Sequence, residues 1–276
     1  EISVYRAPTD NDRGRGPVDY WGISSDDLGP LGTGTGQWGV SHAQRWEMVR
    51  LHLLRRTWHG SSCESGMRVL IERWAPPAAQ FGLEARWTFT PVDGKNEGVP
   101  AAAAISGNCL AVKVEMSPYG EWPERIPRAG VRLRIPGTEW TASWVGETDI
   151  AYSDLPGANP NGFGCAELKD LWDVGVKPQE GGHRPGLKVL ELRGEERVLI
   201  IIPRSEMGWS ASPWSERELA QAGHWEDLSE SNRTFVWLDA VQDGIGTRSC
   251  GPDARPEFGA RMAARTMEFI LCVTDL

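Results

Sequence analysis

The stretch Leu83-Glu84-Ala85-Arg86-Trp87-Thr88-Phe89-Thr90 carries an apolar side chain at every odd position and a polar one at every even position. Successive side chains of a β-strand point to opposite faces, so this pattern predicts a strand with one face in a core. Met67–Trp74 comes before it, across a turn that contains Pro, Ala and Gly, and we expect the two stretches to pair.

The same period of two recurs along the rest of the chain, between turns that contain Gly and Pro. The further stretches are 110–116, 131–135 (ended by Pro136-Gly137), 187–192, 197–202, 235–241 and 265–273. Many strands with few helices between them predict an all-β fold, an antiparallel sandwich.

Helical pattern is confined to two places. Ser215–Ala222 begins with a Ser able to cap a helix and has Glu218 three residues later, the signature of a capping box. Ala166–Trp172 fits either a short helix or an irregular loop. We expect Arg13–Gln37 to form a long surface loop and Gly94–Gly107 a variable connection. Because no linker divides the chain, residues 1–276 are predicted to form one domain.

Composition excludes several classes of partner. The formal charge is −9 with scattered basic residues, which disfavours nucleic acid. The longest apolar run, 198–203, is far shorter than the roughly 18 to 20 residues of a membrane span, so no membrane is expected. The 14 tryptophans, against 4 tyrosines and 6 phenylalanines, are a mild hint of sugar contact, although tryptophan also fills wide gaps between sheets.

The five cysteines are odd in number and form no C-x-x-C pair, and the five histidines are dispersed. These patterns predict neither a disulfide framework nor a structural zinc site, and they favour a reducing compartment. The N-terminal residues show no secretory signal. We therefore expect a cytoplasmic protein.

Five motifs follow one another along the chain: Tyr5-Arg6-Ala7-Pro8-Thr9-Asp10-Asn11-Asp12-Arg13-Gly14; Pro127-Arg128-Ala129-Gly130; Pro178-Gln179-Glu180-Gly181-Gly182-His183-Arg184; the series Ser212, Leu219, Ala222, His224 and Leu228; and Asp239-Ala240-Val241-Gln242-Asp243-Gly244-Ile245-Gly246. Together they resemble the small C-terminal domain of the bacterial-type β-galactosidases of glycoside hydrolase family 2. The first and third matches are long and specific, and the set spans nearly the whole chain.

This resemblance implies a galactose mutarotase-like β-supersandwich that lacks its first strands, within an enzyme that removes terminal non-reducing β-D-galactose from β-galactosides. A retaining glycosidase needs two carboxyl groups about 5 to 5.5 Å apart. In the family that pair, with the Mg and Na sites, lies in a preceding TIM barrel. For this segment the resemblance implies no catalytic residue and no metal, a galactoside as ligand, and the remaining domains or large subunit as partner.

The resemblance also suggests site residues. Phe235 stands at the place of the family's sugar-contacting tryptophan, and Trp237 shares its face if 235–241 is a strand. The alternative, equally open, is that both pack in the core. The loop-motif residues are Arg6, Asp10, Asn11, Asp12, Glu180, Arg184 and His224.

The side chains of these motifs can also have purely structural roles. The short polar side chains of Thr9–Gly14 can bond to nearby backbone N–H groups and form a tight loop. Asp10-Asn11-Asp12 is an acidic run of the kind found in calcium-binding loops, but Arg13 adjoins it and the later Glu of an EF-hand is missing, so we expect no metal. Arg184 is expected to anchor a carboxylate or carbonyl, and His224 to cap or pack near the end of the helix.

Two departures from the family pattern suggest a divergent member. Gly146–Asp154 keeps Tyr152 and Asp154 but lacks the family's Pro, Glu and final Arg, and Phe235 replaces tryptophan. Two other functions stay open. One is a free carbohydrate-binding module. The other is an aldose epimerase, which would require a His, either His183 or His224, and a Glu facing one pocket.

Overall fold

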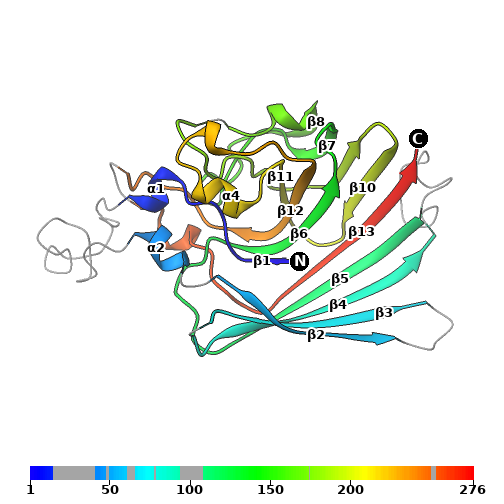
Figure 1. Cartoon of the computed structure of the whole chain (residues 1–276), viewed down its shortest axis with the longest axis horizontal. Helices are drawn as coiled ribbons and strands as arrows, with labels where there is room; N and C mark the ends of the chain where they lie inside the picture. The colour runs from blue at the N-terminus through cyan, green and yellow to red at the C-terminus, as the bar shows by residue number, and fades with distance from the viewer. Residues whose placement is uncertain are drawn as a thin grey trace, which may run out of the picture.

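The chain folds into two antiparallel sheets packed face to face, as the computed structural model shows (Figure 1). The structure describes residues 1–14, 41–47, 50–60, 66–77, 79–93, 108–173, 175–249 and 253–276. The predicted loop Arg13–Gln37 lies outside these ranges except for its first two residues, and the predicted connection 94–107 lies wholly outside them. The all-β antiparallel sandwich is confirmed.

The larger sheet has the order β2-β3-β4-β5-β13-β10-β9-β7-β8. Its strands are β2 (His52–Gly60), β3 (Arg68–Ala75), β4 (Gly82–Val92), β5 (Asn108–Tyr119), β7 (Thr141–Glu147), β8 (Asn161–Glu167), β9 (Val189–Arg193), β10 (Arg197–Pro203) and β13 (Arg265–Asp275). The predicted pairing of the first two stretches is confirmed, because β3 and β4 are antiparallel neighbours with Leu70 opposite Trp87.

The smaller sheet has the order β1-β6-β12-β11. Its strands are β1 (Ile2–Ser3), β6 (Arg128–Pro136), β11 (Gly208–Ser212) and β12 (Arg233–Gln242). Side chains of β12 point alternately to the two faces of the sheet, as predicted. Val236 and Leu238 enter the main core between the sheets, whereas Phe235 and Trp237 enter a separate cluster with Trp172 on the opposite face.

The helices are short: α1 (Asp10–Arg13), α2 (His42–Glu47) and α4 (Glu216–Gln221), with 3-10 turns at Leu168–Asp170, Trp225–Asp227 and Pro256–Phe258. Ser215 caps α4 and forms the predicted capping box with Glu218. The stretch 166–172, left open between helix and loop, contains the first of the 3-10 turns. No helix in the described ranges is both long and apolar enough to cross a membrane.

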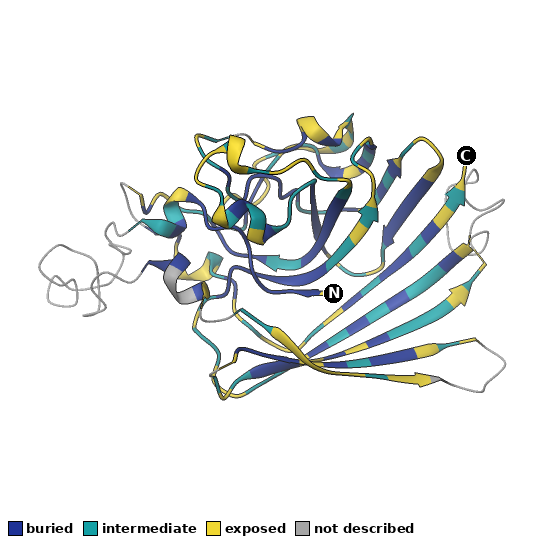
Figure 2. Ribbon diagram, viewed as in Figure 1, coloured by how far each residue is buried: buried dark blue, intermediate teal, exposed yellow. Residues whose placement is uncertain are grey.

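Burial falls off toward the β2 end of the larger sheet (Figure 2). The centre of the sandwich is fully buried, for example at Val114, Leu190 and Met267, each with no exposed surface. On β2, in contrast, Leu54 and Trp58 are 58% and 57% exposed. The main core is therefore incompletely covered at this end.

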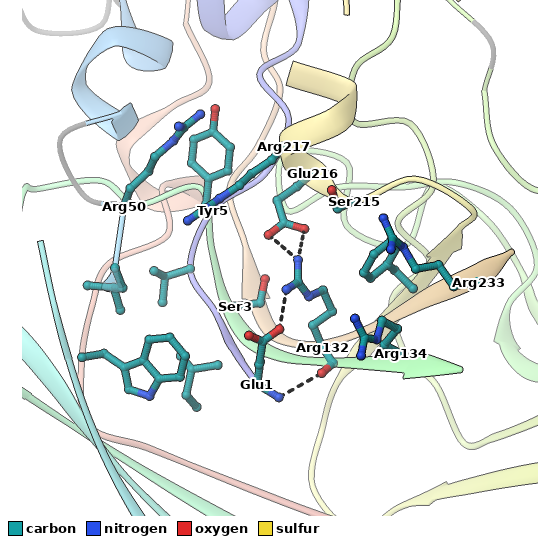
Figure 3. Close-up of a pocket in the computed structure, with 15 residues that line it drawn as sticks. Glu1, Ser3, Tyr5, Arg50, Arg132, Arg134, Ser215, Glu216, Arg217 and Arg233 are labelled. Carbon is teal, nitrogen blue, oxygen red and sulfur yellow. Dashed lines mark hydrogen bonds and ion pairs between the residues drawn. The ribbon is translucent and has the colours of Figure 1, made fainter. Parts of the chain in front are cut away.

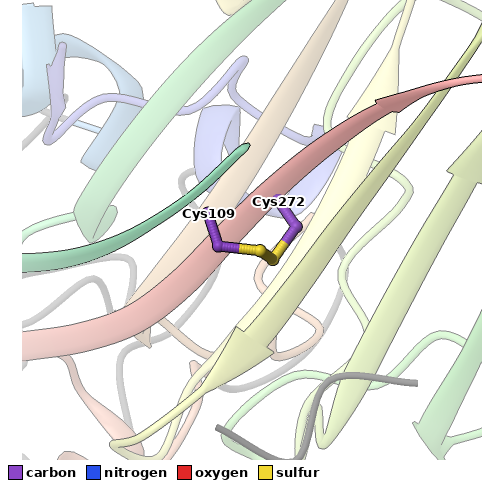
Figure 4. The surroundings of a disulfide bond; sticks show 2 residues. All are labelled: Cys109 and Cys272. Atoms are coloured by element: carbon purple, nitrogen blue, oxygen red, sulfur yellow. A yellow bond between two sulfur atoms is a disulfide. The ribbon is translucent and has the colours of Figure 1, made fainter. Parts of the chain in front are cut away.

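The sequence predicts no disulfide framework, but the structure contains a disulfide bond between two of the cysteines. Cys109 on β5 and Cys272 on β13 lie directly opposite each other in neighbouring antiparallel strands and are bonded (Figure 4). Their Cα atoms are 4.2 Å apart and they are separated by 163 residues in sequence. Because the pair depends on strand order in the sheet, neither the count nor the spacing of cysteines could indicate it.

Candidate functional site

The first motif is organised around Arg6, which has no exposed surface. Thr9 caps α1 in a capping box with Asp12, so the predicted self-bonded loop forms as one helical turn. Arg6 donates to both carboxylate oxygens of Asp12, at 3.1 and 2.8 Å, and to the backbone oxygens of Asp243 and Gly244, at 2.5 and 3.2 Å. The first and last motifs are therefore joined by hydrogen bonds from Arg6 to backbone oxygens, and Arg6 is itself held by a buried ion pair within the first motif.

Other motif residues strengthen the same junction. Asn11 donates to the backbone oxygen of Gly246 at 2.7 Å, and the backbone N–H of Asp10 donates to Gln179 at 2.8 Å. Asp154, retained in the divergent segment, accepts from the backbone N–H groups of Ile245 and Gly246 at 3.1 and 2.7 Å. Four segments distant in sequence thus meet in what we call the motif junction.

A second buried cluster surrounds Arg128, from the Pro127–Gly130 motif. Its guanidinium donates to Asp239 and to Gln242, both at 2.8 Å, and lies 3.8 Å from Glu180. Tyr152 donates its hydroxyl to Glu180 at 3.3 Å, and burial together with this carboxylate raises the pKa of Tyr152 well above its usual value. Burial alone would raise the pKa of Asp239, but Arg128 and His183 hold it below its usual range.

Sequence reasoning missed a third cluster next to the junction. Arg125 pairs with Asp243 at 2.7 Å and with Asp253 at 3.0 Å, and His42 Nε2 lies 2.6 Å from Asp253. Although burial opposes ionisation, these partners and Arg248 hold the pKa of Asp253 far below its usual value. No local pattern marked these residues, since 211 positions separate His42 from its carboxylate.

Phe235 borders a cavity of about 300 Å³ that is rich in arginine (Figure 3). The guanidinium carbons of Arg132 and Arg233 lie 5.1 and 5.4 Å from the centre of its ring. Arg132 is bound in turn by Glu216, at 2.7 Å, and by Glu1. Only 5% of Phe235 is exposed.

A larger pocket, of about 620 Å³, lies between the smaller sheet and the ends of β7 and β8. Tyr152, His183, Asp239 and Gln242 contribute to its lining, and Glu147 lies at its β7 side. His183 fits here because Gly208 has no side chain: a Cβ on Gly208 would come within 2.2 Å of the imidazole ring.

The family described as "Beta galactosidase small chain" matches residues 1–271. The chain belongs to the β-galactosidase small-chain family. It is 30% identical to a β-galactosidase of Arthrobacter sp. strain B7 over 96% of its own length and 25% of that protein. It is 22% identical to a β-galactosidase of Kluyveromyces lactis over 98% of its length and 23% of that protein. The chain thus spans about a quarter of the length of these relatives.

Solved structures resemble the small chain only slightly. The galactosidase domain of an alpha-galactosidase–sucrose kinase gives a TM-score of 0.36 at 7% identity, over 82% of the small chain and 28% of that chain. A GH36 alpha-galactosidase from Geobacillus stearothermophilus gives 0.37 at 7% identity, over the same fractions.

The other residues predicted from the sequence do not share one site. Arg184 donates to the backbone oxygens of Leu171 and Gly182, both at 3.0 Å. His224 is exposed, and its backbone N–H donates to the Asp227 carboxylate at 2.9 Å. Trp237 is 1% exposed. Among the described residues of the small chain, no group of three or more His, Cys, Asp or Glu is placed to hold a metal ion.

Proposed function

We propose that this chain is the sugar-facing, non-catalytic part of a β-galactosidase of glycoside hydrolase family 2, which removes terminal β-D-galactose. The observation that carries the proposal is the family match over residues 1–271, combined with the chain's span of about a quarter of its relatives. The catalytic carboxylates, with any Mg or Na, would then belong to the remaining domains or large subunit.

The state of the buried carboxylates supports a non-catalytic role. A general acid needs a pKa raised toward the working pH so that it can donate a proton. Asp12, Asp239 and Asp253 each lie within 3.0 Å of an arginine nitrogen. The pKa of both Asp239 and Asp253 is lowered rather than raised. The pKa of Asp243 is raised by burial, but its carboxylate is held by Arg125 and by the backbone N–H of Ala260. These groups are suited to holding loops together.

We propose that Phe235, with Trp237 packed behind it, forms one wall of the pocket that holds the substrate sugar. Phe235 lines the arginine-rich cavity, it is 5% exposed, and its ring lies near the guanidinium groups of Arg132 and Arg233, so packing orients it before any sugar arrives. Contact of this kind raises kcat only where it favours the transition state over the bound substrate.

The first test compares the purified chain with a complete enzyme that contains it, using a nitrophenyl β-galactoside. The chain alone should show no turnover and the complete enzyme should show it. Turnover by the chain that survives further purification would contradict the non-catalytic role.

The second test is Phe235→Ala in the complete enzyme. Loss of a wall contact should lower kcat/KM by about tenfold with little change in Tm. Phe269→Ala is the matched control, because Phe269 is 2% exposed in the main core and its removal should cost about 3 to 5 kcal/mol of stability. If Phe235→Ala behaves like the control, Phe235 is a core residue and the wall assignment fails.

A second candidate function is an aldose epimerase, which requires a His and a Glu at one pocket. His183 and Glu147 both line the larger pocket, whereas His224 does not. Polarimetry of freshly dissolved α-D-galactose with the purified chain tests this candidate. A rate of mutarotation equal to that of buffer would exclude it.

A further inference from the structure

The larger pocket has the size and shape of a small-molecule site. We call it the Tyr152–His183 pocket. Its volume of about 620 Å³ lies within the range of roughly 300 to 1,000 Å³ that is usual for ligand pockets. Six segments of the chain line it: the end of β7, the loop 152–157, the start of β8 at Asn161, the loop 183–188, the start of β11 with the two residues before it, and the end of β12.

Three buried side chains of the lining each have one polar atom without a hydrogen-bond partner. Glu147 Oε2, Asp239 Oδ1 and Gln242 Nε2 make no hydrogen bond, although their residues are only 8%, 1% and 3% exposed. Buried polar atoms are almost always hydrogen-bonded in folded proteins. Two acceptors and one amide donor thus lie on residues that line one pocket, and they are matched to a ligand that offers both hydroxyl hydrogens and hydroxyl oxygens.

The charge of the lining selects among polar ligands. Its acidic residues are Glu147, Glu206 and Asp239, its basic residue is Lys188, and it contains no arginine. An excess of carboxylates repels phosphate, sulfate and carboxylate groups. Arg128 offsets the charge of Asp239, and Lys188 is outnumbered by Glu147 and Glu206, so the hydrogen-bonding capacity with a small negative excess fits a neutral polyol.

An exposed aromatic ring neighbours one lining residue. Phe163 on β8 lies directly opposite Val145 on β7, and Val145 lines the pocket. Phe163 is 70% exposed, so its ring is available for contact next to Val145. A flat apolar ring next to polar groups favours a ligand with one C–H face and several hydroxyls, which describes a pyranose rather than an open-chain polyol.

We propose that the Tyr152–His183 pocket binds a neutral pyranose sugar, with Glu147, Asp239 and Gln242 bonded to its hydroxyls and Phe163 against its C–H face. The inference rests on the proposed function only in the choice of galactose as the first probe. For a ligand of this size we expect a Kd of about 1 to 10 mM.

The test is titration of the purified chain with D-galactose, D-glucose, mannitol and inorganic phosphate, followed by protein-observed NMR. Both pyranoses should produce saturable shifts at residues of the pocket, and mannitol and phosphate should not. Phe163→Ala and Glu147→Gln should each weaken galactose binding by about fivefold or more. Phe163 is exposed, so its replacement leaves the core intact.

Trp58→Ala is the matched control, since Trp58 is an exposed aromatic residue on β2, at the opposite edge of the same sheet. It should change the Kd by less than about twofold. Absence of saturable shifts with both pyranoses, equal binding of mannitol or phosphate, or equal effects of Trp58→Ala and Phe163→Ala would each overturn the proposal. Because no hydrolysis is measured, its failure is distinguishable from that of the proposed function, which the turnover assay tests.

Discussion

Replacing Arg128 by Met should destabilise the chain strongly, because Arg128 is the cation shared by a buried acidic cluster. Its side chain has no exposed surface, it bonds Asp239 and Gln242 at 2.8 Å, and it lies 3.8 Å from Glu180. Met fills a similar volume, so the change removes the charge while limiting the cavity.

The magnitude follows from what remains after the substitution. Removal of one partner of a buried ion pair costs about 3 to 5 kcal/mol, since it leaves an uncompensated charge. Asp239 loses Arg128 and keeps His183 at 3.2 Å, and Glu180 keeps the Tyr152 hydroxyl. We therefore expect a loss of about 4 kcal/mol at pH 7. For a chain of this size that is roughly a 6 to 10 °C decrease in Tm.

The loss should depend on pH. In the unmodified chain the pKa of Asp239 is lowered, so its stabilising contribution is present above the unfolded-state value of about 3.9 and is lost as the pH falls through the lower folded value. Without Arg128, burial should raise this pKa, and protonation then relieves the unpaired charge. The difference in unfolding free energy between the two proteins should therefore shrink as the pH falls from 7 toward 4.

Urea unfolding at several pH values measures both effects. Arg193→Met is the matched control, because Arg193 pairs with Glu191 at 2.9 Å but their side chains are 50% and 31% exposed. The control should cost less than about 1 kcal/mol. The reasoning is refuted if Arg128→Met costs no more than the control, or if its cost at pH 7 and pH 4 is the same.

Three further outcomes follow from the fold. Reduction of the Cys109–Cys272 bond should lower the unfolding free energy by about 2 to 5 kcal/mol, because it closes a long loop, and equal urea midpoints with and without reductant would contradict this. The chain should bind an apolar-surface dye and scatter light as an associated species, and a Leu54→Ser/Trp58→Ser double variant should do so less; a clean monomer without dye binding would count against the exposed apolar face. Ser215→Ala removes the cap of α4 and should cost about 1 kcal/mol by thermal melting, whereas an unchanged Tm would show that the cap is dispensable.

The sequence by itself determined the strands, the principal helix and the family. Apolar and polar side chains alternate along Leu83–Thr90 because one face of β4 packs in the core and the other does not. Such a pattern can be read from neighbouring residues alone. Ser215 and Glu218 are three residues apart, so their capping box can be recognised without any knowledge of tertiary structure. The motifs around Arg6 and Glu180 were long enough to indicate the family that the match over residues 1–271 shows.

The tertiary structure alone decided which residues meet. Alternation placed Phe235 and Trp237 on one face of β12, but only the tertiary structure shows that Trp237 packs against Trp172 while Phe235 also borders a cavity. The Cys109–Cys272 bond and the Arg6–Asp243 contact join positions separated by 163 and 237 residues. The physical reason is that a periodic pattern reports whether a side chain is buried, whereas its partner depends on strand order and register across the whole sheet.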